Sequence, residues 1–174
     1  TLLTLGDLDN DGADDYLVGA WFDPSNRGLV ALLSGRTGAL LRVHLGQQTN
    51  DVLGAPLVAA GDLDRDGVLD YAVGNWGASF RSLIQVHSGA TGALLRQWSE
   101  STYDIASSLL AGRDVDLDGI PDVVAGSLAY RNAAGDTGRL QAFSMRDQQL
   151  LSWVEPPLFG VSHATFTESM ADLG

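Results

Sequence analysis

Short apolar runs alternate with polar, glycine-rich turns along the whole chain. In the middle of the sequence these runs fall at about 56–60, 69–74, 82–88 and 93–98. Such runs, rich in β-branched and aromatic residues and bounded by Gly, Asn or Asp, are typical of strands and too short for helices. The pattern therefore predicts an all-β protein whose strands are joined by tight turns.

The same order of runs and turns recurs along the chain. Clusters of aspartate begin at Asp7, Asp62 and Asp114, with spacings of 55 and 52 residues. The segment Ser34-Gly-Arg-Thr-Gly-Ala-Leu-Leu-Arg42 returns as Ser88-Gly-Ala-Thr-Gly-Ala-Leu-Leu-Arg96. Four short antiparallel strands in a repeat of about 50 residues are the pattern of a β-propeller blade.

We therefore expect a single propeller-type domain with three repeats of four antiparallel strands. Its approximate repeats are 1–53, 54–105 and 106–166, and 167–174 resembles the start of a fourth. Because closed propellers have four to eight blades, three blades form an incomplete ring. Two ways of completing it stay open: the blades belong to a longer chain, or copies of the chain form a homo-oligomer.

Each aspartate cluster has the pattern Asp-x-Asp-x-Asp-Gly-x-x-Asp. The clusters use 12 of the 22 acidic residues, and the remaining 10 equal the Lys and Arg in number, so the loops account for the net charge of −12. Carboxylates this close together repel one another unless a cation is bound. Oxygen donors without His or Cys suit a hard ion, and a flexible loop with many ligands favours calcium over magnesium. The sequence predicts three Ca²⁺ sites.

By analogy with calcium loops, the ligands are the side chains at loop positions 1, 3, 5 and 9 and the carbonyl at position 7. The expected sets are Asp7, Asp9, Asp11, Ala13 and Asp15; Asp62, Asp64, Asp66, Val68 and Asp70; and Asp114, Asp116, Asp118, Ile120 and Asp122. An EF-hand is excluded, because position 12 is Val18, Val73 or Ala125 instead of Glu. Ordinary aspartate turns are the alternative, which the threefold repetition disfavours.

The segment from Leu53 to Gly74, LGAPLVAAGDLDRDGVLDYAVG, resembles an FG-GAP repeat. This repeat is the blade unit of the integrin α-subunit propeller and of many bacterial surface proteins. The resemblance covers nearly the whole chain, although Leu53 replaces the Phe of the motif and Pro121 lies inside the third loop. It implies that calcium bound by the matching Asp residues is structural. In integrin α subunits the opposite face contributes to binding of ligand and partner subunit, but no ligand specificity carries over, because those loops do not match in sequence.

The connections between the second and third strands of each repeat lie on the face opposite the acid loops in such a blade. They contain aromatic residues and arginines, which anchor interfaces and stack on sugars or peptide groups. The candidate ligand-binding residues are Trp21, Phe22 and Arg27; Trp76, Phe80 and Arg81; and Tyr130 and Arg131. They indicate a protein or glycan partner. The alternative is that Trp21 and Trp76 fill the seams between blades.

Composition narrows the function classes. The absence of Cys excludes disulfides and thiolate sites. The negative charge argues against nucleic acid and anionic membranes as partners. No apolar run approaches the ~20 residues needed to cross a bilayer, so we expect no membrane insertion. Because weak calcium loops are useful where calcium is abundant, an extracellular, cell-surface or periplasmic location and a role in recognition, scaffolding or cell adhesion are expected.

The sequence contains no recognisable catalytic machinery. His44, His87 and His163 have no metal-ligand spacing, and neither a nucleophile elbow nor a phosphate loop is present. We therefore expect no catalysis by this domain. The alternative is that it forms part of a calcium-dependent propeller enzyme, such as a polysaccharide lyase, or an accessory domain of a phospholipase, whose calcium would keep open water positions.

Overall fold

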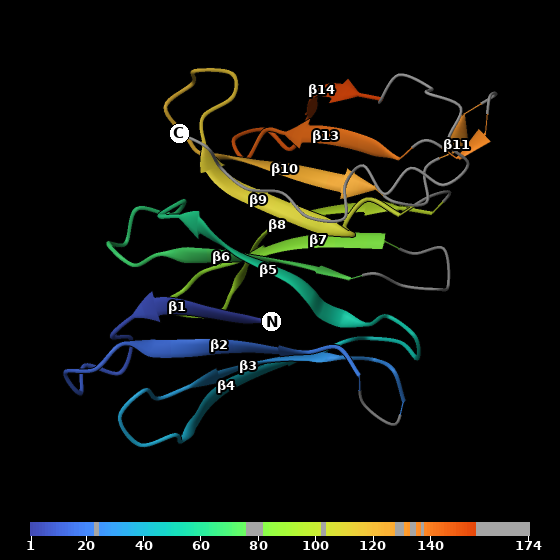
Figure 1. The fold of residues 1–174 in the computed structure, drawn as a ribbon. Helices are drawn as coiled ribbons and strands as arrows, with labels where there is room; N and C mark the ends of the chain where they lie inside the picture. Colours follow the sequence, from blue (N-terminus) through green and yellow to red (C-terminus); the bar gives the residue numbers. More distant parts are fainter. Residues whose placement is uncertain are drawn as a thin grey trace.

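Three antiparallel four-stranded sheets make up most of the structure, a computed structural model (Figure 1). It describes residues 1–22, 25–75, 82–101, 104–127, 131–132, 135–136 and 138–155. Within these ranges the regular elements are all strands, and no segment forms a long apolar helix of the kind that spans a bilayer. The predicted all-β propeller blades are confirmed.

The strands of each sheet follow one another in sequence, apart from an extra hairpin in the third repeat. The first sheet contains β1 (Leu2–Gly6), β2 (Asp15–Ala20), β3 (Leu29–Leu33) and β4 (Leu40–Leu45). The second contains β5 (Leu53–Gly61), β6 (Asp70–Asn75), β7 (Ser82–His87) and β8 (Leu94–Glu100). The third contains β9 (Ser108–Arg113), β10 (Asp122–Ser127), β13 (Arg139–Phe143) and β14 (Leu150–Val154), and the hairpin is β11 (Arg131–Asn132) with β12 (Gly135–Asp136).

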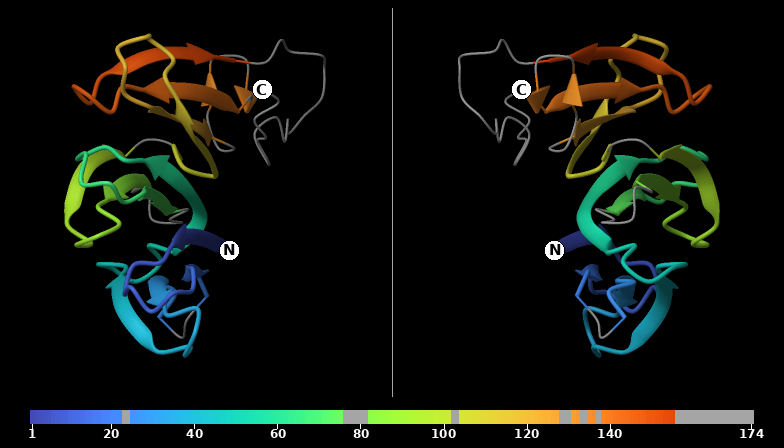
Figure 2. Two further views of the ribbon diagram at one scale, coloured as in Figure 1. Left: turned by 90° about the vertical axis from the view of Figure 1, so that its left-hand side faces the viewer. Right: turned by 90° about the vertical axis from the view of Figure 1, so that its right-hand side faces the viewer.

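The sheets lie in a row, with the second between the first and the third (Figures 1 and 2). The first strands, β1, β5 and β9, lie on the same side of the row, and each contacts the next. This is the arrangement of propeller blades, whose first strands line the central axis. The described sheets do not close into a ring.

Two apolar cores hold the sheets together. Between the first and second sheets, Leu17 and Val30 pack against Leu57, Tyr71 and Val73. A second core, which joins the second and third sheets, is formed by Ala60, Ala72, Ile84, Val86, Trp98, Ile105, Ala106, Leu109, Val123, Ala125, Phe143 and Met145. Side chains alternate between the two faces of a strand, so each sheet can contribute to the cores on both sides. We call the two contact zones the first seam and the second seam.

The face of the first sheet that points away from the second is apolar and exposed. Strand register places Leu2, Val18, Ala31 and Val43 side by side on it. Leu2 is 66% exposed and Val43 is 43% exposed. In the second sheet, the corresponding face packs on the first sheet. The first sheet therefore presents a blade-packing surface that no described residue covers.

Strand β5 is longer than the expected run at 56–60, because pairing with β6 begins at Leu53. Irregular register between Leu53 and Leu57, and again between Ala59 and Gly61, accommodates the extra residues. Gly54 adopts a positive φ of 95° within this strand. Its Cα lies against Gly19 of the first sheet, where a side chain on either residue would collide with backbone atoms.

Candidate metal sites

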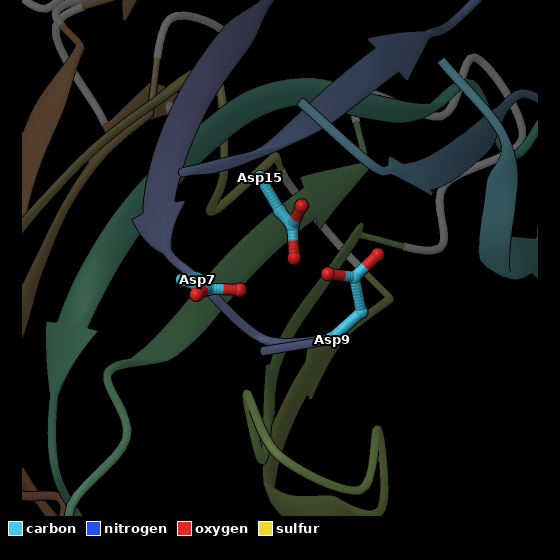
Figure 3. Close-up of side chains that lie close together, drawn as sticks. All are labelled: Asp7, Asp9 and Asp15. Carbon is cyan, nitrogen blue, oxygen red and sulfur yellow. The ribbon is translucent and has the colours of Figure 1, made fainter. Parts of the chain in front are cut away.

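The three acid loops connect the first and second strands of their sheets. In the first loop, the side chains of Asp7, Asp9 and Asp15 point toward a common space (Figure 3). Each offers one carboxylate oxygen, and these oxygens lie within 4.8 Å of one another. The sequence predicts four carboxylate ligands in this loop, and three of them lie close together in the structure.

The other two loops form equivalent clusters. In the third, Asp114, Asp116 and Asp122 occupy the same loop positions, 1, 3 and 9. The second cluster instead consists of Asp62, Asp64 and Asp66, at positions 1, 3 and 5, with oxygens again within 4.8 Å of one another. The carboxylate that stands apart is therefore at position 5 in the first and third loops and at position 9 in the second.

The loops share a backbone conformation that depends on glycine at position 6. Gly12, Gly67 and Gly119 have φ values of 89°, 89° and 86°. This left-handed region strains residues that have a Cβ, so glycine suits the position. Position 4 also has a positive φ in every loop, at Asn10, Arg65 and Leu117. The three loops share the Asp and Gly positions and differ at most others, yet they have the same turn geometry. The Asp and Gly positions therefore determine the loop conformation.

The first carboxylate of each loop is held by backbone amides. Asp7 accepts bonds from the N–H groups of Asp11 and Gly12, at 3.0 and 2.9 Å. Asp62 and Asp114 accept equivalent pairs in the second and third loops. Such bonds satisfy the turn's donors and fix the direction in which the remaining lone pairs point.

The aspartate at position 9 joins each acid loop to the turn between the third and fourth strands. Asp15 is fully buried, and its two oxygens accept the N–H of Leu8 at 2.8 Å and of Gly35 at 3.0 Å. Asp70 bridges Leu63 and Gly89 in the same way. Asp122 bridges Val115 and Met145. The sequence shows this aspartate as a ligand candidate only, and its second role follows from the fold.

The pKa of Asp70 at position 9 of the second loop is perturbed mainly by burial. Burial raises the pKa of this carboxyl above its usual range, and the charge of Asp64 acts in the same direction. The N–H groups of Gly89 and Leu63 oppose the shift. A cation beside Asp70 would favour its ionised form and so reverse the effect of burial.

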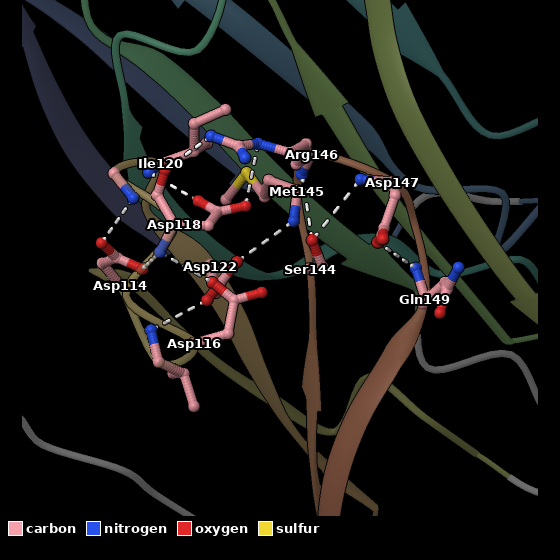
Figure 4. A network of polar contacts seen from close by, with 12 residues as sticks. Asp114, Asp116, Asp118, Ile120, Asp122, Ser144, Met145, Arg146, Asp147 and Gln149 are labelled. Carbon is pink, nitrogen blue, oxygen red and sulfur yellow. Dashed lines mark hydrogen bonds and ion pairs between the residues drawn. The ribbon is translucent and has the colours of Figure 1, made fainter.

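The first and third loops have an arginine next to position 5, and the second does not. In the third loop, Arg146 Nε lies 3.0 Å from an Asp118 carboxylate oxygen, and its Nη2 donates to the Asp118 carbonyl (Figure 4). Arg36 donates to the Asp11 carbonyl in the first loop. The equivalent residue beside the second loop is Ala90, and there Asp66 joins the cluster.

The clusters fit the donor geometry of calcium. Two oxygens bound to one calcium ion at 2.3–2.6 Å can be at most about 5.2 Å apart. The observed limit of 4.8 Å lies within this bound. The donors are all oxygen, which is the coordination that hard cations prefer. Any further ligand, such as the carbonyls of Ala13, Val68 and Ile120, would add to these three.

Comparison with known proteins relates the chain to integrin α subunits. It is 30% identical to integrin alpha-3 of Mus musculus over 147 residues, which cover 73% of this chain and 14% of that protein. It is also 30% identical to integrin alpha-5 of Xenopus laevis over 157 residues, covering 76% of the chain and 15% of that protein. The chain thus matches only about one seventh of these proteins. No protein-family model matches it.

A solved structure described as the Dos1 propeller superposes with a TM-score of 0.52, covering 84% of this chain and 35% of the other. At 14% identity this likeness concerns the fold alone. It agrees with the integrin matches and with the three four-stranded sheets. The chain is an integrin-α-like β-propeller of the FG-GAP type.

The candidate recognition residues of this propeller are only partly described. Trp21 and Phe22 follow β2, are 44% and 77% exposed, and meet edge to face with ring centroids 5.7 Å apart. Arg27 is exposed, and its Nε donates to the Ser25 hydroxyl. Trp76, Phe80, Arg81 and Tyr130 lie outside the described residues, as does the Arg131 side chain.

Two arginines of the propeller cross between neighbouring sheets, a role that sequence reasoning missed. Arg42 on β4 donates to the carbonyls of Gly89 and Ala90, at 2.9 and 2.7 Å. Arg96 on β8 donates to the carbonyl of Met145 at 2.7 Å. Each arginine thus reaches the turn between the third and fourth strands of the next sheet. Both arginines end the repeated segment at 34–42 and 88–96, which could have indicated a shared role, but the repeat does not identify the groups that they bind.

Proposed function

We propose that this propeller is a calcium-stabilised recognition or scaffolding module that acts outside the cell or at its surface and has no catalytic activity of its own. The observation that carries the proposal is the threefold cluster of carboxylate oxygens, each held within 4.8 Å in a loop of the same backbone form. Three sites bind Ca²⁺ through the sets predicted from the sequence, including the position 7 carbonyls.

Calcium stabilises the propeller because it binds the folded loops more tightly than the unfolded chain. At a free concentration ten times the dissociation constant, one site contributes about 1.4 kcal/mol to the free energy of unfolding. Each loop also touches the neighbouring turn through its position 9 aspartate. Calcium therefore rigidifies both the acid loop and the turn next to it, which together form one end of each sheet.

The test is calorimetric titration of the chelated protein with CaCl₂, together with thermal unfolding. We expect three binding events and a melting temperature that rises with calcium concentration. Asp9→Ala and Asp64→Ala should each remove one event. Asp14→Ala is the matched control, because Asp14 is exposed in the same loop but lies outside the cluster. Equal melting of the wild type with and without chelator would contradict the proposal.

The recognition surface is proposed at the opposite end of the sheets, where Trp21, Phe22 and Arg27 are exposed. An exposed aromatic pair beside an arginine suits a protein or glycan partner. On arrays of extracellular glycans and purified ectodomains, Phe22→Ala should reduce binding at least severalfold without changing the melting temperature. Leu117→Ala, an exposed control on the calcium side, should leave binding unchanged. The reverse outcome would place recognition elsewhere.

A further inference from the structure

Three titratable side chains meet at the first seam. His44 lies on β4, while Tyr71 and His87 pair with each other on β6 and β7. The imidazole centroids are 4.4 Å apart, and Tyr71 stacks on His87 at 5.6 Å. A hydrogen bond of 2.6 Å joins the Tyr71 hydroxyl to His44 Nε2. Two basic groups are thus in contact inside a packing interface.

The second seam uses apolar residues at the same positions. Strand register makes Trp98 the counterpart of His44, Val123 that of Tyr71, and Phe143 that of His87. The Trp98 and Phe143 rings lie 5.6 Å apart in the second core, with Val123 beside them. The molecule therefore contains two seams of one design, of which only the first has titratable groups at these positions.

His87 has no place for a second proton. Its Nδ1 lies 3.1 Å from the Gly92 carbonyl oxygen, which can only accept, so Nδ1 carries the hydrogen of the neutral ring. Its Nε2 is then the basic atom, and it is buried without a hydrogen-bond partner among the described residues. Protonation would create a buried, charged N–H group without an acceptor, which is costly.

The charges around the imidazoles also disfavour protonation. Burial lowers the pKa of His44 to about 4, assisted by His87 and then by Arg42. Burial likewise lowers the pKa of His87, the Gly92 hydrogen bond opposes this, and Arg42 adds to it. Burial is thus the main cause of both shifts, and the neighbouring basic groups add to it.

The surrounding strands offer little compensating negative charge. Among the described residues, Asp51 lines the same cavity as both histidines, and Asp70 is next to Tyr71 in the sequence. Asp70 is held by two loop amides, and Asp51 accepts the N–H of Gln48 at 2.7 Å. Strands β5, β7 and β8 contribute the neutral side chains Leu53, Gln85 and Leu94 to the cavity.

Protons can reach the pair without unfolding of the protein. A cavity of about 480 Å³ opens between the first and second sheets, and His44 and His87 both line it. His44 itself is only half-buried. Acidification therefore acts directly on the seam.

We propose that the first seam is an acid-sensitive joint, at which protonation of His44 and His87 favours separation of the first sheet from the second while the second seam stays closed. The residues that carry it are the two imidazoles in contact, the partnerless Nε2 of His87 and the neighbouring Arg42. The proposal does not depend on whether the acid loops bind calcium or on the identity of a partner.

The direction of the pH effect follows from the lowered pKa values. The unfolded chain, with an ordinary histidine pKa of 6.5, binds protons that the folded seam does not bind. The contribution of the joint to stability is thus complete above pH 6.5 and is lost as the pH falls toward about 4. From pH 7.5 to 5.5, each histidine that stays neutral in the fold raises the unfolding constant about tenfold.

The test replaces the three titratable residues of the first seam with the apolar residues found at the same positions of the second seam. Denaturant unfolding at saturating calcium should give an unfolding constant that rises at least about tenfold between pH 7.5 and 5.5 for the wild type, because His44 stays neutral in the fold over this range and His87 adds to the rise. The triple variant His44→Trp, Tyr71→Val, His87→Phe should lose most of this rise. His163→Gln, which alters the third histidine of the chain, should retain it.

Two further measurements apply even if the triple variant does not fold. NMR titration of the wild-type imidazoles should show His44 titrating near pH 4 and His87 titrating below its ordinary value of 6.5. Hydrogen exchange at pH 5.5 should show loss of protection in β1–β4 while β9 and β10 keep theirs, relative to intrinsic rates. Ordinary titration of both histidines, uniform loss of protection, or a triple variant with wild-type pH dependence would each overturn the proposal.

Discussion

The carboxylate at loop position 5 shows how one neighbouring residue alters a metal site. Asp118 pairs with Arg146, and the Asp11 carboxylate accepts the Ser34 hydroxyl while Arg36 binds the Asp11 carbonyl. Next to the second loop, where Ala90 replaces the arginine, Asp66 joins the cluster. A positive charge at the turn both attracts the position 5 carboxylate and repels a cation. The three loops are therefore unequal, and the second is expected to bind calcium most tightly.

Removing the arginine should strengthen the first site. Arg36→Ala is expected to increase calcium affinity at the first loop by about two- to fivefold, the range that corresponds to an exposed ion pair. Calorimetric titration at low ionic strength measures it, and the gain should shrink in salt because exposed charges are screened.

The reciprocal change at the second loop gives the control. Ala90→Arg should lower affinity there by a similar factor, whereas Arg27→Ala, at the opposite end of the sheets, should change neither site. If Arg36→Ala weakens calcium binding instead, the arginine holds the loop in its binding form and does not compete with the ion.

At the scale of strands and turns, hydrogen bonds to main-chain atoms hold the sheets together. The position 9 aspartates connect two turns within a sheet, and Arg42 and Arg96 connect successive sheets. Carbonyl oxygens and amide hydrogens are present whatever the side chain, so these links depend on backbone position. The seams thus combine apolar packing with a small number of oriented polar bonds.

We predict that Arg42→Ala destabilises the first seam more than Arg96→Ala destabilises the second. Arg42 binds two carbonyls of the next turn, Arg96 binds one, and each charged hydrogen bond is worth about 1.5–3 kcal/mol when shielded and less where water reaches it. Denaturant unfolding should show losses of about 2 and 1 kcal/mol. Arg42→Lys should recover only part of the loss, because an ammonium group lacks the planar fork. Equal losses would mean that packing, not the bonds, sets the effect.

The sequence was sufficient for the four-stranded repeat and for the position of the acid loops, because both depend on local patterns, but not for the extra residues of β5 or for the hairpin of β11 and β12. Short apolar runs that end in Gly mark β2 and β6, and the spacing of Asp and Gly marks each loop. It did not reveal that His44 meets His87, or that Arg42 reaches Gly89, because these pairs are more than 40 residues apart. Their proximity depends on how one sheet stacks on the next, and a single sequence contains no local signal of that stacking.

The whole molecule is a row of sheets with an apolar face exposed at one end. Leu2, Tyr16 and Val43 on the first sheet belong to the kind of face that the second sheet buries. Tyr16 occupies the position of Tyr71, directly after the last aspartate of its loop. We propose that this face receives a further four-stranded blade, from a longer chain or from a second copy.

Measuring the mass of the 174-residue chain in solution tests whether a second copy occupies this face. We expect concentration-dependent association in light scattering, which Val43→Lys should weaken by at least tenfold because it places a charge in the contact. Arg27→Lys, at an exposed connection, should not change it. A monomer at all concentrations would exclude copies of this chain as the occupant and leave a blade of a longer chain.

The arginine links that run from one sheet to the next also bear on how such proteins evolve. Each arginine binds peptide carbonyls of the next repeat. A duplicated or exchanged repeat therefore still offers carbonyl acceptors for the arginine, even when its side chains have diverged. Gene duplication can then lengthen or shuffle the array without a matching change in the adjacent unit. A chimaera in which one repeat is replaced by another should consequently assemble, provided the donor unit retains its arginine.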